Sequence, residues 1–268
     1  MRSDRIAAGS KTRAQGDFAR SNDSLDEIFA FVQSALDAGG AGGADAYAIL
    51  MAVEELFTNM VKYNATGTGR IDLEIECGAG SVSCVLTDPD SERFDMTLAP
   101  EVDIHQAVEQ RRPGGLGIHL VRRLVDSITY EYAERRSRIR FRRAFSDATA
   151  GGSDRAGLIC QPSATTGDRA MFDIGYGDDG AIALSGRLDA AQCDKAQAFL
   201  DGAGTAGVLD FRGLEYISSA GLGVLLKVHK RLLAAGGRLR LVNVNKHIYD
   251  IFRFSGFDNV FDVERAGA

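Results

Sequence analysis

One predicted helix carries side chains suited to acid–base and metal chemistry. Glu55, Asn59 and Lys62 follow one another at spacings of four and three residues, along one side of a helix predicted over 45–63. An amide oxygen suits Mg²⁺, an ammonium group suits triphosphate oxygens, and a carboxylate beside both can orient or deprotonate an attacking hydroxyl. The spacing permits a phosphoryl-transfer site, but it equally fits a solvated helix face with one i, i+4 pair.

Asp88 is a candidate for recognising a nucleotide base. It ends an apolar strand, where its carboxylate could accept a hydrogen bond from an exocyclic amine such as that of adenine. The structural alternative is an aspartate that ends a strand and begins a turn.

A glycine turn and two arginines are candidates for contacting phosphates. Gly114, Gly115 and Gly117 open directly into a predicted helix, whose N-terminal amides and dipole favour phosphate. Arg111 and Arg112 precede the turn and could supply positive charge to a γ-phosphate, or form a solvated charge pair.

The second half of the chain holds a candidate phospho-acceptor. A buried strand predicted over 208–211 is followed by a helix that begins at Ser218 or Ser219. A serine there can simply cap the helix, which contributes about 1 kcal/mol. A hydroxyl at an exposed helix start can also meet a kinase, and a phosphate then adds nearly two negative charges that can switch partner binding.

Two predicted domains must position these residues. Residues 1–17 are expected to be a polar, flexible lead-in, and the first domain spans 18–145. It contains a helix from Ser24, with Glu27 in capping-box spacing, the helix over 45–63, two strands around Gly78 to Gly80, a helix over 118–126 and a closing hairpin. Residues 146–170 form a linker rich in small and polar residues. The second domain, 171–268, alternates strands and helices and predicts a mainly parallel sheet.

Composition excludes several classes of function. The 268 residues suffice for two domains, and 45% hydrophobic with 25% charged residues indicates a globular chain. A net charge of −6 disfavours direct nucleic-acid binding. We expect a cytoplasmic location, because no signal peptide or membrane span is visible. The spacing of the cysteines disfavours a zinc site or a disulfide framework; they are Cys77, Cys84, Cys160 and Cys193.

Three segments in order resemble the GHKL ATPase family: E-E-L-F-T-N-M-V-K-Y-N, L-T-D and R-P-G-G-L-G-I-H-L-V-R-R-L-V-D. Specifically, they are similar to anti-sigma-factor serine kinases of bacterial partner-switching systems. The resemblance implies an α/β sandwich, with a mixed sheet and helices on one face, that binds ATP and Mg²⁺. It implies Glu55 as catalytic base, Asn59 as Mg²⁺ ligand and Asp88 as the adenine contact. The chain departs from the family where Asp90 replaces a glycine and the turn to Phe94 is one residue longer.

The second half resembles the STAS domain of anti-sigma-factor antagonists, over about 171–265. Its segment S-S-A-G-L-G matches the phosphorylation motif D-S-S/T-G-L-G of that family, together with S-G-R-L-D-A-A-Q and F-S-G-F-D. The resemblance implies that Ser219 is the phospho-acceptor, and Ser218 replaces the family's aspartate.

These observations predict a fused partner-switch regulator in which ATP bound to the first domain phosphorylates a STAS domain. The linker of about 25 residues allows transfer within one chain, and transfer between the chains of a homodimer is equally compatible with the sequence. The expected partner is a sigma factor or another partner-switch protein. The alternative is a scaffold that is catalytically weak or inactive and uses both domains as docking surfaces.

Overall fold

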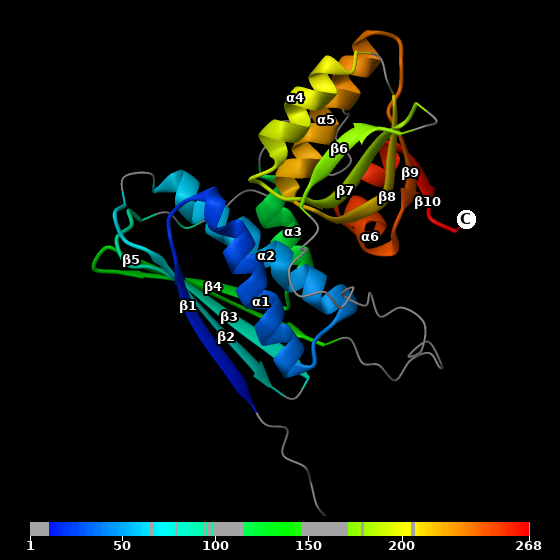
Figure 1. The fold of residues 1–268 in the computed structure, drawn as a ribbon. Helices are drawn as coiled ribbons and strands as arrows, with labels where there is room; N and C mark the ends of the chain where they lie inside the picture. Colours follow the sequence, from blue (N-terminus) through cyan, green and yellow to red (C-terminus); the bar gives the residue numbers. More distant parts are fainter. Residues whose placement is uncertain are drawn as a thin grey trace, which may run out of the picture. The chain divides into compact units, whose positions relative to one another are not determined.

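The computed structural model describes residues 11–64, 67–78, 80–93, 95, 98, 115–145, 171–177, 180–204 and 207–267. The chain divides into two compact units, and each has its own five-stranded sheet (Figure 1). The first unit holds the described residues up to 98 together with Gly117–Phe145, and the second holds the described residues from 171 onward.

The first unit is an antiparallel sheet with helices on one face. Its elements are β1 (Thr12–Phe18), η1 (Asn22–Ser24), α1 (Leu25–Gly39), α2 (Gly43–Tyr63), β2 (Ile71–Gly78), β3 (Ser81–Asp88), α3 (Leu116–Leu124), β4 (Ser127–Ala133) and β5 (Arg136–Ala144). The strand order is β1-β2-β3-β5-β4. Helix α1 packs on β1 and β2, and α2 packs on β3 and β5 (Figure 1).

The predicted α/β class is confirmed, but the predicted mixing of strand directions is wrong for the described strands of this sheet. Every neighbouring pair is antiparallel. Strands β3 and β4 do run in the same direction, joined through α3, but the β4–β5 hairpin places β5 between them.

Strand β1 corrects the predicted lead-in, because residues 12–17 belong to the sheet. They pair with β2 from Thr12 opposite Cys77 to Phe18 opposite Ile71. The sequence TRAQGDF lacks an apolar alternation, so its order comes from backbone pairing with β2, which a sequence pattern does not display. Phe18 anchors the end of the strand, since it is 3% exposed and meets the ring of Phe31 edge-on at 5.5 Å.

The start of α1 also differs from the predicted capping box. Ser21 accepts a hydrogen bond from the amide of Asp23 and begins a short 3₁₀ turn, whereas the Ser24 hydroxyl donates to the carbonyl of Ala19. The cap therefore lies one turn earlier than the Ser24–Glu27 spacing suggested. The predicted glycine stop is present, because Gly40 adopts a left-handed conformation with φ of 73° after the last turn of α1.

The second unit confirms the predicted alternation of strands and helices. Its elements are β6 (Asp173–Tyr176), β7 (Ile182–Leu188), α4 (Cys193–Gly202), β8 (Val208–Ile217), α5 (Ser219–Ala234), β9 (Arg240–Val244), α6 (Lys246–Ser255), η4 (Phe257–Asn259) and β10 (Asp262–Arg265). Strands β7 to β10 are parallel, and β6 is an antiparallel edge strand. The sequence pattern did not predict the short edge strands β6 and β10.

One face of this second sheet is covered by helices. Buried and exposed side chains alternate along β7 and β8. In the strand order β10-β9-β8-β7-β6, each parallel strand lies beside the one that precedes it in the chain, always on the same side of it. Right-handed crossovers of this kind place successive helices on one face of a sheet. The carboxyl ends of β7, β8 and β9 consequently share one edge, and α5 begins there, directly after β8.

No helix within the described ranges is long and apolar enough to cross a membrane. Cys77, Cys84 and Cys193 form no disulfide within the described residues, and Cys160 lies outside them. Burial raises the pKa of the Cys77 and Cys84 thiols, which keeps both protonated and poorly reactive near neutral pH.

Replacing Phe18 tests whether β1 is part of the first core. We expect Phe18→Ala to lower the free energy of unfolding by about 3 kcal/mol, because it removes a buried ring. Lys11→Ala at the exposed start of the same segment is the control and should change it by less than about 0.5 kcal/mol. Urea unfolding of the full chain, followed by circular dichroism, measures both; equal effects would contradict the placement of β1.

Candidate nucleotide and phospho-acceptor sites

Glu55 and Asn59 face each other across one turn of α2, as their spacing predicted. The Asn59 side-chain nitrogen donates to the Glu55 carboxylate at 2.7 Å and to the Glu55 backbone carbonyl at 2.7 Å. With both of its N–H groups engaged, the amide leaves its oxygen available to an outside donor or cation. Both side chains are partly exposed, so solvent or a ligand can reach the pair.

The start of α3 lies directly against Glu55. A methyl group built on Gly117 would lie 1.8 Å from the Glu55 carboxyl carbon and 1.9 Å from one of its oxygens. Only a glycine allows this approach, and the Glu55 carboxylate lies against the first turn of α3. Helix starts attract anions through their free amides and dipole. Gly115, one residue before α3, has φ of 81°, a conformation that also favours glycine.

Lys62 does not join Glu55 and Asn59 in the described contacts. Its exposed ammonium lies 5.1 Å from the centroid of the Tyr63 ring. Arg111, Arg112 and Gly114 lie outside the described residues.

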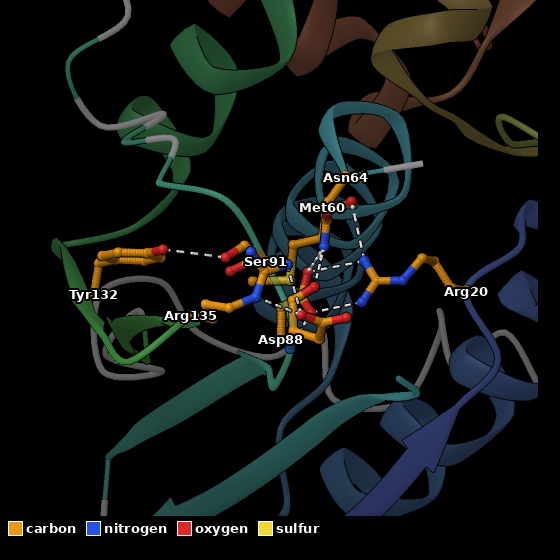
Figure 2. Close-up of polar contacts among 8 residues, drawn as sticks. Arg20, Met60, Asn64, Asp88, Ser91, Tyr132 and Arg135 are labelled. Atoms are coloured by element: carbon orange, nitrogen blue, oxygen red, sulfur yellow. Dashed lines mark hydrogen bonds and ion pairs between the residues drawn. The ribbon is translucent and has the colours of Figure 1, made fainter. Parts of the chain in front are cut away.

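Asp88 is buried in a network that sequence analysis did not foresee. Figure 2 shows Arg20 reaching Asp88 with two nitrogens, at 2.8 and 2.5 Å, beside the amide of Asn64 at 3.1 Å. The side chains of Arg20 and Asp88 are 7% and 1% exposed, which makes this a buried, bidentate ion pair. The backbone amide of Asp90 donates a fourth hydrogen bond to the Asp88 carboxylate, at 3.2 Å.

The longer turn after Asp88 is held by the β4–β5 hairpin. Arg135 lies in the hairpin turn, and its guanidinium pairs with the Asp90 carboxylate at 2.8 Å (Figure 2). The backbone carbonyl of Arg135 accepts a hydrogen bond from the Ser91 amide at 2.7 Å. The hydrogen bond and charge of Arg135 hold the pKa of Asp90 below its ordinary value. The Tyr132 hydroxyl donates to the Ser91 carbonyl at 3.2 Å. The residue that replaces the family's glycine is therefore neutralised by a neighbouring turn.

Arg20, Asn64 and Arg135 are the residues that sequence reasoning missed. Arg20 is 68 residues from Asp88, and Arg135 is 45 residues from Asp90, so no local spacing connects them. Asn64 directly follows the helix predicted over 45–63, and its position there indicates only a helix end. The single available hint was Asp90 itself, because a carboxylate at a turn position usually occupied by glycine requires a partner of opposite charge.

In the second unit, Ser218 rather than Ser219 caps α5. The Ser218 hydroxyl accepts the Gly221 amide at 3.1 Å, and Ser218 is 4% exposed. Its own amide donates to the Leu188 carbonyl of β7 at 3.0 Å. Ser219 is the first residue of α5 and is partly exposed. An aspartate caps a helix about as well as a serine, so Ser218 keeps the capping role that the family's aspartate could perform.

The two glycines that follow Ser219 have different structural roles. A methyl on Gly221 would lie 2.9 Å from a side-chain carbon of Ile217 and 3.0 Å from the Leu188 carbonyl oxygen. Among the described residues, a methyl on Gly223 would meet no atom within 4 Å outside the backbone of its own helix. Gly221 therefore lets α5 pack on β7, whereas packing in the described part of the second unit does not require Gly223.

The comparisons with known families agree with both folds. Residues 18–143 match the model of the histidine kinase-like ATPase domain, and residues 175–263 match the model described as "Mlab, STAS domain". The chain therefore joins a histidine kinase-like ATPase domain to a STAS domain. The predicted pairing of a GHKL-type domain with an antagonist-type domain is confirmed.

Individual relatives cover parts of the chain. A Bordetella bronchiseptica protein described as an anti-sigma factor antagonist, BtrV, is 42% identical over 74 residues, which are 28% of this chain and 58% of that protein. The solved RsbU and RsbW domains of a Mycobacterium tuberculosis protein are 12% identical, cover 50% of this chain and 32% of that one, and superpose with a TM-score of 0.37. An anti-sigma factor antagonist structure from Thermotoga maritima is 20% identical, covers 35% of this chain and 85% of its own, and has a TM-score of 0.30.

The two glycines of α5 provide a matched pair of substitutions. We expect Gly221→Ala to destabilise the second unit by about 1–3 kcal/mol, because the methyl overlaps β7. Gly223→Ala should stabilise it by up to about 1 kcal/mol, because alanine is the better helix former and the space is open. Thermal unfolding of the full chain compares them, and a loss of stability in Gly223→Ala would contradict the open surface at that position.

Proposed function

We propose that the first domain binds Mg-ATP and phosphorylates a STAS domain on Ser219, so that the chain is a self-contained element of a partner switch. The observation that carries this proposal is that the Glu55 carboxylate lies against both the Asn59 amide and Gly117 at the start of α3. A carboxylate, an amide and a helix start that contains glycine together form a constellation suited to phosphoryl transfer.

The residues present fit a magnesium nucleotide. Asn59 would hold Mg²⁺ through its amide oxygen, and the ion would neutralise charge on the phosphates. The first turn of α3, with Gly115 and Gly117, is suited to phosphate oxygens, and Gly114 extends the same turn in the sequence. A phosphate there would take the place of the Glu55 carboxylate and free that group for catalysis.

Three further residues complete the proposed site. Asp88, at the end of β3, is the carboxylate that would contact the exocyclic amine of adenine once its Arg20 partner has withdrawn. Lys62 and Arg112 would bring positive charge to the phosphate oxygens. To do so, the Lys62 ammonium would have to move away from the Tyr63 ring.

Glu55 would act as the general base. The Ser219 oxygen attacks the γ-phosphorus, the bond from that phosphorus to the bridging oxygen breaks, ADP leaves, and the serine proton passes to Glu55. The acceptor is a STAS domain of the same chain or of a second copy. Dependence of the initial rate on protein concentration distinguishes transfer within a chain from transfer between chains.

A phosphate on Ser219 would change what the second domain can bind. It would stand at the first residue of a 16-residue helix, where the helix dipole stabilises negative charge. It would also add charge and bulk at the start of α5, one turn before Gly223, where the helix surface is not covered by other described residues. The partner controlled in this way would be a sigma factor or another partner-switch protein.

A scaffold without catalytic activity is the second candidate. It is favoured by the Asp88 network, because Arg20 and Asn64 occupy the carboxylate that would recognise the base. In that case both domains act as docking surfaces.

Intact mass after incubation of the full chain with Mg-ATP separates the two functions. We expect one added phosphoryl group in the wild type and none in Ser219→Ala. Ser218→Ala loses the cap but keeps the acceptor, so it should still gain the group. Glu55→Gln should slow the reaction by about a hundredfold or more, because the base is lost.

Two outcomes of this experiment decide against parts of the proposal. A wild type that binds ATP but gains no mass favours the scaffold. A Ser219→Ala protein that is still modified refutes Ser219 as the acceptor.

Gly117→Ala tests the contact between α3 and Glu55. The added methyl would displace the carboxylate, which is the flexible end of its side chain, so the fold should persist. We expect phosphoryl transfer to fall by about tenfold or more, because the base leaves its position. Gly78→Ala is the control in the same unit, since a methyl there meets no atom within 4 Å. Equal transfer rates in the two variants would show that this contact does not matter for activity.

A further inference from the structure

The Asp88 carboxylate has no acceptor position left for a base. One oxygen accepts an Arg20 nitrogen and the Asp90 amide, and the other accepts the second Arg20 nitrogen and the Asn64 amide. A carboxylate offers about four lone-pair positions. An adenine amine could bond to Asp88 only after one of these donors has withdrawn.

Arg20 is the donor that can withdraw. Asn64 is held from two sides, since the same amide nitrogen also donates to the Asp90 carbonyl, and the Asp90 amide is part of the backbone of the turn. Arg20 comes from the segment between β1 and η1, outside both regular elements. Its Nε is buried without a hydrogen-bond partner in the described part of the chain, and its contact with the Met60 carbonyl is long, at 3.4 Å.

A glycine segment covers the pair. A methyl on Gly67 would lie 2.5 Å from the Asn64 side-chain nitrogen and 2.9 Å from the guanidinium carbon of Arg20. Because Gly67 lies against the pair and both side chains are buried, water does not compete with Arg20 for hydrogen bonds to the Asp88 carboxylate.

We propose that Arg20 is a specificity-determining residue, an internal competitor that withholds Asp88 from the nucleotide base. The inference rests on the proposed nucleotide site and adds to it. With Arg20 in place, a purine that carries a 6-amino group has no advantage over one that carries a 6-oxo group. Removing Arg20 exposes an acceptor that the 6-amino group can satisfy and the 6-oxo group cannot, because a carboxylate repels a carbonyl oxygen.

The test is the ratio of affinities for Mg-ATP and Mg-ITP, measured by calorimetric titration of the full chain. We expect a ratio near one in the wild type. Arg20→Met should raise the affinity for ATP, and with it the ratio, by about tenfold or more, since a site built to hydrogen-bond a substrate group rejects analogues that lack it. A change in packing alone would move both affinities together and leave the ratio unchanged.

Two more variants guard against a misfolded Arg20→Met protein. Arg20→Lys keeps the positive charge but cannot bond both oxygens at once, so it should raise the ratio by a smaller factor. The double variant Arg20→Met with Asp88→Asn removes the carboxylate and should return the ratio to near one. Circular dichroism confirms that each variant is folded before titration.

The outcomes separate this inference from the proposed function. A wild type that already prefers ATP strongly, with the same ratio in Arg20→Met and Arg20→Lys, overturns the role of Arg20 and leaves the nucleotide site standing. Folded proteins that bind neither nucleotide, with or without Arg20, overturn the nucleotide site and this inference together.

Discussion

The burial of Asp88 is the constraint around which one end of the first domain is arranged. A carboxylate that is 1% exposed is stable only when opposite charge and hydrogen-bond donors surround it. The donors come from three places: Arg20 before α1, Asn64 after α2, and the backbone of the turn after β3. The same turn is then tied by Asp90 to Arg135. One buried charge thus connects the two helices to β3 and to the β4–β5 hairpin.

The two candidate sites share a structural device, a helix that begins against another element through a glycine. At α3 the absent side chain of Gly117 makes room for the Glu55 carboxylate, and at α5 that of Gly221 makes room for β7. The first amides of a helix have no acceptor within the helix, so a helix start favours negative charge. These two helix starts are where the phosphates of the proposed nucleotide and the proposed phosphate on Ser219 would lie.

The two departures from the family motifs have local compensations. Asp90 introduces a charge where the family has glycine, and Arg135 neutralises it from the hairpin, holding the pKa of Asp90 below its ordinary value. Ser218 lacks the charge of the family's aspartate but still accepts the Gly221 amide as a cap.

The sequence by itself determined the order of the two domains, most of their helices and strands, and the approach of Asn59 to Glu55. These features depend on periodicity, glycine stops and motifs within a few residues, and local energetics decide them. The tertiary structure alone decided that β1 joins the sheet, that β5 lies between β3 and β4, and that Arg20 occupies Asp88. Each of these depends on partners far apart in the chain, and a buried charge or an unpaired strand edge selects its partner only once folding has brought the candidates together.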